Sequence, residues 1–184
     1  MNNLILFNKP FRVISQFSEL DDKVTLKKFI STKGFYPAGR LDHDSEGLLL
    51  LTNDGKLQAH IANPRFKMPK TYWAQVEGAI SNEAIVKLTQ GVELKDGMTR
   101  KADVIEIDPP NLPARDPPIR TRKNIPTSWL SITISEGKNR QVRRMTANVG
   151  FPTLRLFRQS IGPWSVDDIK PGKHIALSVN LPKA

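Results

Sequence analysis

The sequence predicts an α+β fold in which one mixed β-sheet is flanked by a few helices. Segments with strand character outnumber those with helical periodicity, and they do not alternate regularly with helices as in a doubly wound fold. Residues 48–51 are four leucines, a short apolar run typical of a strand covered on both faces. With 184 residues, 39% of them hydrophobic, the chain is expected to form one domain over residues 1–184, with room for two lobes.

The elements of the N-terminal third follow from apolar runs and turn residues. Residues 4–7 predict a first strand that stops before Pro10, and residues 13–17 are expected to return as its partner. Residues 24–30 predict one short amphipathic helix. After the leucine strand, Asp54 is placed to cap a helix that runs through about residue 62.

The rest of the chain continues with strands and two more helices. Ser81 is a good N-cap residue for a helix with apolar side chains on one face, and a basic helix is expected over residues 138–149. Further strands are predicted at residues 72–76, 104–107, 129–134 and 153–157.

A proline-rich segment separates two of these strands. Between Asp108 and Thr127 there are six prolines, interleaved with four Lys and Arg side chains. Such a segment cannot form a helix interior or a central strand. Because it is long for a connector in a compact domain, a functional loop is expected here.

The charge of the chain indicates a polyanionic partner. The formal net charge is +10, and residues 115–158 hold ten Lys and Arg against two acids, so +8 of the +10 falls in that stretch. A basic face that only keeps the protein solvated is the alternative to a binding surface.

Composition also excludes several classes of site. The chain has no cysteine, which rules out disulfides and thiolate metal ligands. Its three histidines lie far apart in the sequence, without the spacing of a metal site. We find neither a long apolar span nor a signal-peptide pattern, so we expect no membrane association and a reduced, cytoplasmic setting.

Residues 39–55, GRLDHDSEGLLLLTNDG, place a charged loop directly before the leucine strand. Arg40, Asp42, Asp44 and Glu46 lie within seven residues, and loops held by a rigid scaffold often carry chemistry. An aspartate before an apolar strand also serves commonly as a turn or capping residue. A third interpretation makes the three carboxylates Mg²⁺ ligands of an RNA phosphodiesterase or nuclease.

Four segments in order carry a resemblance to a known family. They are NKP at residues 8–10, the loop and strand at residues 39–55, KTY at residues 70–72 and EGKNRQVRRM at residues 136–145. On these segments the chain resembles the pseudouridine synthases that modify ribosomal RNA, although Ser45 stands where many relatives carry Thr. The resemblance implies a large, mostly antiparallel sheet with a central active-site cleft, and chemistry that needs neither cofactor nor metal.

The resemblance also assigns roles in the reaction. Isomerising uridine breaks the N-glycosidic bond, rotates the uracil and rejoins it through carbon, which requires an ionised carboxylate beside the sugar and base. By resemblance Asp42 is that carboxylate, Arg143 pairs with it, and Tyr72 lies against the uracil. Leu154 and Leu156 are expected to wall the pocket.

RNA recognition is the second implication of the resemblance. A stacked base must be flipped out of the RNA, and Arg40 is the candidate to fill its place. The cations expected to contact RNA, mostly at phosphates, are Lys9, Lys70, Arg120, Arg122, Lys138, Arg140 and Arg144. Asp44 and Glu46 are expected in solvent.

The partner implied is ribosomal RNA. The similarity is greatest to the branch that acts on 23S rRNA. The substrate is expected to be either naked RNA or a precursor of the ribosomal subunit, and the enzyme is expected to be a monomer. Relatives often carry an S4 domain before the catalytic domain, and its absence is expected because this chain begins at the first catalytic strand. A non-catalytic RNA-binding assembly factor remains the other alternative.

Overall fold

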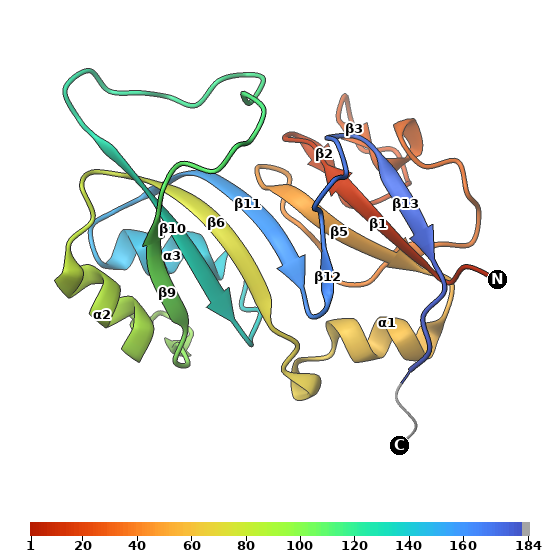
Figure 1. The fold of residues 1–184 in the computed structure, drawn as a ribbon. Helices are drawn as coiled ribbons and strands as arrows, with labels where there is room; N and C mark the ends of the chain where they lie inside the picture. Colours follow the sequence, from red (N-terminus) through yellow and green to blue (C-terminus); the bar gives the residue numbers. More distant parts are fainter. Residues whose placement is uncertain (182–184) are drawn as a thin grey trace. The chain divides into compact units, whose positions relative to one another are not determined.

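The chain divides into two compact units. The structure, a computed structural model, describes residues 1–181. Unit 1 comprises Met1–Met68 and the segment from Arg158 onward, and unit 2 comprises Pro69–Phe157. Figure 1 shows the two units in the colours of the sequence, and each is described by itself below.

Unit 1 is built on an antiparallel sheet with the strand order β13-β1-β5. Strand β1 lies between the other two, with Leu4 opposite Leu177 on one side and Thr52 on the other. The strands of this unit are β1 (Leu4–Lys9), β2 (Val13–Ile14), β3 (Val24–Thr25), β4 (Tyr36–Pro37), β5 (Glu46–Thr52), β12 (Trp164–Ser165) and β13 (His174–Leu177). Its helices are α1 (Gly55–Ala62) and the 3₁₀ turns Leu26–Lys28 and Pro64–Phe66.

Strand β5 and helix α1 form as predicted. All seven residues of β5 are buried, which confirms that the leucine strand is covered on both faces. Asp54 caps α1, because one oxygen of its carboxylate accepts hydrogen bonds from the backbone amides of Lys56 (2.9 Å) and Leu57 (3.3 Å).

Two predictions for the N-terminal region are wrong. Residues 24–30 form strand β3 and a single 3₁₀ turn instead of an amphipathic helix, because β3 pairs with β2 in parallel and the Thr25 hydroxyl caps the turn. Residues 13–17 do not return as the partner of β1, since β5 and β13 already occupy both edges of that strand.

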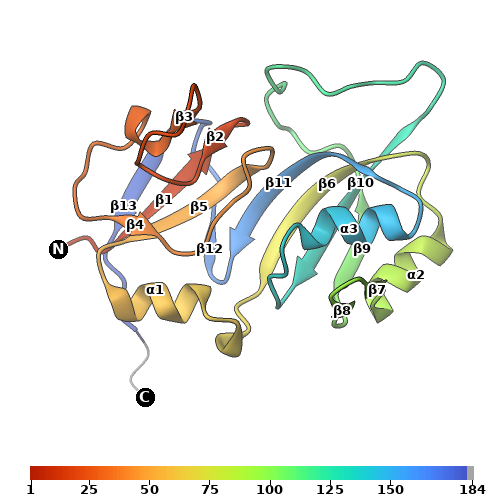
Figure 2. The ribbon, with the colours of Figure 1, turned by 180° about the vertical axis from the view of Figure 1, so that it is seen from behind.

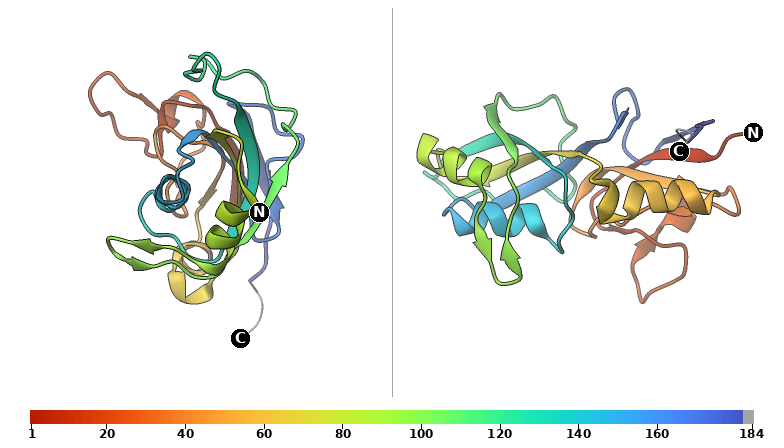
Figure 3. Two further views of the ribbon diagram at one scale, coloured as in Figure 1. Left: turned by 90° about the vertical axis from the view of Figure 1, so that its left-hand side faces the viewer. Right: turned by 90° about the horizontal axis from the view of Figure 1, so that it is seen from below.

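Unit 2 contains its own run of hydrogen-bonded strands, with helices on one face. The unit 2 part of β11 lies next to β6, followed by β10 and β9, and both β6-β10 and β10-β9 are antiparallel. Figures 2 and 3 show helices α2 and α3 on the same side of these strands. The elements are β6 (Lys70–Glu77), α2 (Asn82–Gln90), β7 (Glu93–Leu94), β8 (Gly97–Met98), β9 (Asp103–Ile107), β10 (Thr127–Ile134), α3 (Gln141–Asn148) and β11 (Thr153–Ile161), whose last residues lie in unit 1.

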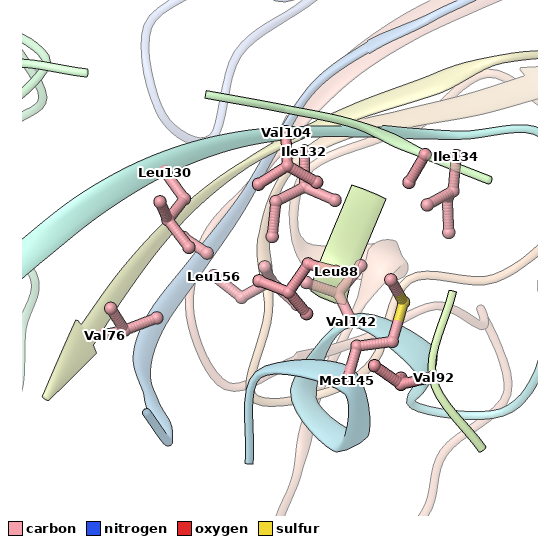
Figure 4. Close-up of a cluster of buried hydrophobic side chains, with 12 residues drawn as sticks. Val76, Leu88, Val92, Val104, Leu130, Ile132, Ile134, Val142, Met145 and Leu156 are labelled. Carbon is pink, nitrogen blue, oxygen red and sulfur yellow. The ribbon is translucent and has the colours of Figure 1, made fainter. Parts of the chain in front are cut away.

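The core of unit 2 lies between its helices and its sheet. Leu88 of α2 and Val142 and Met145 of α3 pack against Val76 and Ile132 of the sheet (Figure 4). These side chains are almost fully buried, so their apolar surface stabilises the contact between helix and strand layers.

The predictions for the starts of α2 and α3 have different outcomes. The Ser81 hydroxyl accepts a hydrogen bond from the amide of Ala84 at 3.1 Å, which confirms the N-cap of α2. Helix α3 begins later than the predicted 138–149, because Arg140 at its N-cap has a left-handed backbone (φ 51°) that the helix cannot continue through.

The proline-rich segment forms neither helix nor strand. Residues 108–126 leave β9 and return at β10 as one long irregular loop, as predicted, which Figures 1 and 2 show at the upper edge of the unit. Within the described residues, no helix is both long and apolar enough to cross a membrane.

Replacing Gly47 by Ala is expected to destabilise the protein by about 3 kcal/mol or more. Gly47 has φ +106°, and a Cβ there would lie 2.3 Å from the carbonyl oxygen of Arg158. Urea unfolding of the variant measures the loss.

Gly55→Ala is the matched control for this prediction. Gly55 opens α1, has no atom within 4 Å of a built Cβ, and should gain up to about 1 kcal/mol as Ala. Equal stabilities of the two variants would show that the contact between Gly47 and Arg158 is not tight.

Candidate active site

The backbone of the loop that carries Asp42 is fixed on both sides of that residue. The buried Ser15 hydroxyl donates to the Leu41 carbonyl at 2.6 Å and accepts from the Leu41 amide at 3.1 Å. The carbonyl of Asp42 accepts from the amide of Ser45 at 3.0 Å, and that of His43 accepts from the amide of Arg12 at 2.8 Å. The carboxylate is therefore presented from a preorganised loop.

Arg158 makes hydrogen bonds to the same loop and to strand β5. Its side chain is 4% exposed, and its Nε donates to the carbonyl of Leu48 in β5 at 2.8 Å while Nη1 donates to the carbonyl of Arg40 at 3.4 Å. The guanidinium thus joins strand β5 to the residues directly before Asp42. This role was missed from the sequence, where Arg158 counted only as one charge of the basic stretch.

Lys9 is buried in unit 1 and does not fit the RNA contact predicted for it. The residue has no exposed surface, and its ammonium donates to the carbonyls of Pro10 (2.9 Å) and Val13 (2.8 Å). These bonds close the turn between β1 and β2. Burial lowers the pKa of Lys9 from 10.5 to about 7, although the negative charges of Glu46, Asp44 and Asp42 oppose part of this change.

Glu46 corrects a second expectation. It was predicted in solvent, but it is the first residue of β5 and only 8% exposed. Its charge acts on the Lys9 ammonium more strongly than that of any other carboxylate, which places an acidic group beside the buried cation. Asp44 is intermediate in exposure.

The magnesium interpretation of this loop finds no geometric support. Among residues 1–181, no three His, Asp or Glu side chains are grouped so that they could hold a metal ion. Asp42, Asp44 and Glu46 therefore do not form a cation cage, whatever their proximity in sequence suggests.

Tyr72 and Arg143 belong to unit 2. Tyr72 lies on β6, partly buried against the hydrophobic core of that unit, and Arg143 lies on α3. The predicted roles of these two side chains at the Asp42 carboxylate and the uracil stay predictions.

The two leucines predicted to wall a pocket have different surroundings. Leu156 is 5% exposed and belongs to the hydrophobic core of unit 2. Leu154 is partly buried, and its carbonyl accepts a hydrogen bond from Arg115 at 3.3 Å. Leu156 therefore has a full structural role in the core.

Two of the cations predicted to contact phosphates bind a hairpin of unit 2 instead. Arg144 binds the Asp96 carboxylate with both terminal nitrogens (2.7 and 3.0 Å), and its Nε donates to the carbonyl of Asn139. Lys138 donates to the carbonyls of Asp96 (3.3 Å) and Met98 (3.5 Å). These bonds pin the β7-β8 turn to α3, so the structure does not support either cation as a phosphate contact.

The Arg144 hydrogen bond also affects the titration of its partner. It holds the pKa of Asp96 below its ordinary value, and Asp96 correspondingly raises the pKa of Arg144. The pair therefore contributes stability above the ordinary pKa of an aspartate, and the contribution is lost as the pH falls through the lowered value.

The remaining predicted cations differ in exposure. Arg40, Arg120, Arg122 and Arg140 are exposed, while Lys70 is partly buried. Arg122 also pairs with Glu77 at 3.5 Å. The exposed arginines fit a contact with a polyanion at the surface of their own unit.

Comparison with known proteins gives matches over most of the chain. Residues 3–148 match the family described as RNA pseudouridylate synthase. The ribosomal large subunit pseudouridine synthase E of Vibrio parahaemolyticus is 57% identical over 170 residues, which cover 92% of this chain and 71% of that protein. The protein of the same name from Xanthomonas axonopodis pv. citri is 56% identical over 171 residues, covering 91% and 90%. A solved pseudouridylate synthase matches with a TM-score of 0.79 at 26% identity, covering 97% of this chain and 71% of that one.

Replacing Lys9 by Met is expected to flatten the pH dependence of stability. Because the folded pKa is about 7 and the ordinary value is 10.5, the unfolded chain holds a proton in this window that the folded protein releases. The free energy of unfolding should therefore rise with pH across the window, by up to about 1.4 kcal/mol per unit, and Lys9→Met should remove this rise.

Urea unfolding at pH 7, 8, 9 and 10 measures the two slopes. Lys56→Met, at an exposed lysine of α1, is the control for loss of one positive charge. Identical slopes for the wild-type protein and Lys9→Met would contradict the assignment of this titration to Lys9.

Proposed function

Because this chain belongs to the RNA pseudouridine synthase family, we propose that it isomerises one uridine of 23S ribosomal RNA to pseudouridine. The fold class predicted from the sequence is confirmed by the match to a solved pseudouridylate synthase. The choice of 23S rRNA is supported by the relatives named for the large ribosomal subunit, at 54–57% identity. The similarity covers more than nine tenths of this chain in each case.

The observation that carries the proposal is the rigid presentation of Asp42. Ser15 fixes the peptide before it, and the bond from Ser45 fixes the one after it. Such anchoring holds a carboxylate at one position relative to the sugar without a reorganisation during the reaction. Asp42 acts as the nucleophile or base that allows the N-glycosidic bond to break.

Tyr72 and Arg143 complete the site in this proposal. The aromatic ring of Tyr72 stacks on the uracil, and its hydroxyl reaches a polar group of the base. The Arg143 guanidinium pairs with the Asp42 carboxylate, which keeps that group ionised where water is excluded. The family match spans all three positions, and the resemblance assigns their roles.

The RNA is held by exposed cations. Arg40 precedes Asp42 by two residues, and its side chain is exposed while its carbonyl is tied to Arg158. It stacks in the place of the flipped uridine. The enzyme acts as a monomer in the cytoplasm, on free 23S rRNA or on a precursor of the large subunit.

Asp42→Asn is expected to abolish product while leaving RNA binding within about twofold of wild type, because one neutral amide replaces one carboxylate without changing shape. Product is measured by mapping pseudouridine in 23S rRNA transcripts after incubation with each protein. A chelator in every reaction keeps metal-dependent cleavage from contributing.

Asp44→Asn is the control, since it removes a neighbouring carboxylate of the same loop that has intermediate exposure. Undiminished product from Asp42→Asn would reject Asp42 as the catalytic group. Absence of product from the wild-type protein, with RNA still bound, would favour the non-catalytic assembly factor.

Ser15→Ala is expected to lower kcat by about tenfold to a hundredfold, with a smaller change in the KM for RNA. The Ser15 hydroxyl makes two hydrogen bonds to Leu41, so its loss leaves a buried amide and carbonyl unsatisfied and loosens the Asp42 loop. Single-turnover kinetics separate the chemical step from binding.

Ser18→Ala is the matched control, because Ser18 is exposed and bonds only to nearby Gln16 in the contacts described. If Ser15→Ala instead raised KM by tenfold to a hundredfold and left kcat unchanged, the loop would position the RNA and not the carboxylate.

A further inference from the structure

Resting on the proposed function, we propose that residues 108–126 are a preorganised RNA-binding arm whose shape is set by Arg115, a positioning residue. We call this segment the arm. It leaves unit 2 after β9 and rejoins it at β10 (Figures 1 and 2). Its conformation, its anchors and its charge support the proposal in turn.

The arm makes few backbone hydrogen bonds of its own, and those described run from the amide of Leu112 to the carbonyl of Pro110 (2.9 Å) and from the amide of Ile125 to the carbonyl of Arg122 (3.3 Å). Six of its residues are prolines, which have no amide to donate. Its carbonyls therefore need donors from elsewhere, and side chains that carry several N–H groups are suited to provide them.

Arg115 supplies those donors from within the arm. Its Nε donates to the carbonyl of Pro117 at 3.0 Å and its Nη2 to that of Pro118 at 3.3 Å. Its Nη1 donates to the carbonyl of Leu154 in β11 at 3.3 Å. One planar guanidinium thus folds the chain back on itself and ties it to the sheet.

Further contacts fix the two ends of the arm. Arg155 of β11 donates to the carbonyl of Pro113 at 2.9 Å, and the amide of Gly78 donates to the carbonyl of Pro126 at 2.7 Å. Arg122 pairs with Glu77 at the end of β6. The arm is therefore anchored to strands on both sides of its central residues.

The central residues face solvent with an alternating pattern. Residues 115, 117 and 119 are partly buried, while residues 116, 118 and 120 are exposed. Arg120 and Lys123 are exposed, and the described contacts show no ion pair for either. A positively charged segment held in one shape fits a phosphate backbone, because little ordering entropy is lost on binding.

The basic side chains of the arm have separate roles. Arg120 and Lys123 contact phosphates, whereas Arg115 touches carbonyls of the protein and acts through the shape of the arm. A lysine at position 115 keeps the charge but reaches fewer carbonyls than the fork of an arginine. A lysine substitution therefore distinguishes shape from charge.

Two experiments on the full chain test this inference. The first is limited trypsin digestion, since Arg120, Arg122 and Lys123 supply cleavage sites inside the arm. Arg115→Lys should be cut there about tenfold faster than wild type, because hydrogen bonds that order the segment are lost. Arg100→Lys, at an exposed arginine outside the arm, should be cut at the wild-type rate.

The second experiment measures binding of a 23S rRNA fragment and pseudouridine formation at several salt concentrations. Arg115→Lys should weaken binding about tenfold with an unchanged salt slope, and should raise KM more than it lowers kcat. The double variant Arg120→Gln/Lys123→Gln should keep the arm ordered, which hydrogen exchange of its amides measures because two trypsin sites are lost. It should reduce the slope of log K against log salt concentration by about 1.5.

Each other outcome overturns a stated part of the inference. If Arg115→Lys were cut by trypsin at the wild-type rate and bound RNA with the wild-type affinity, Arg115 would not set the shape of the arm. Faster digestion with wild-type binding would show that the arm does not contact RNA. A wild-type protein that binds RNA through the arm but forms no pseudouridine would contradict the proposed function while leaving this inference in place.

Discussion

The burial of two cations, Lys9 and Arg158, in the unit that carries the Asp42 loop is the constraint on which unit 1 depends. Arg158 and Lys9 are 4% and 0% exposed, and each loses much of its hydration in the folded protein. Carbonyls of Leu48, Arg40, Pro10 and Val13 replace part of the lost water, although Nη2 of Arg158 is buried without a hydrogen-bond partner among the described residues, and the charge of Glu46 opposes the cost at Lys9. These acceptors come from a strand, a turn and the loop, so any movement of one exposes an unsatisfied charge. The cations therefore select one arrangement of the loop more than they stabilise the fold.

Unit 2 uses the same chemistry on its irregular segments. Arg115 and Arg155 bind carbonyls of the proline-rich arm, and Lys138 and Arg144 hold the β7-β8 turn. In both cases a basic side chain donates hydrogen bonds to acceptors of a segment that lies outside the main sheet. Several basic side chains thus bind the protein's own carbonyls, so fewer of the 28 Lys and Arg reach RNA phosphates directly, although the net charge of +10 is unchanged.

Local patterns predicted what depends on local contacts. The four leucines of β5, the Asp54 cap and the Ser81 cap were all predictable, because run length and capping residues act within a few positions of the chain. Burial of charged side chains was not predictable in the same way. Glu46 was expected in solvent and Lys9 at the RNA, whereas both are buried, because only the fold brings their compensating partners together. The helix prediction for residues 24–30 was wrong for a similar reason, since the pairing of β3 with β2 outweighed a weak helical pattern.

A lysine with a pKa of about 7 has a consequence for kinetic work on this enzyme. With this pKa, Lys9 changes its protonation state near neutrality, which alters the charge in the interior of unit 1 by one. The electric field at the carboxylate differs between these states, since the charges of Lys9 and Asp42 act on one another. An inflection near pH 7 in a rate profile would then report the occupancy of a buried ammonium in the scaffold. The Lys9→Met protein, which lacks that ammonium, separates this titration from that of a group that transfers a proton in the reaction.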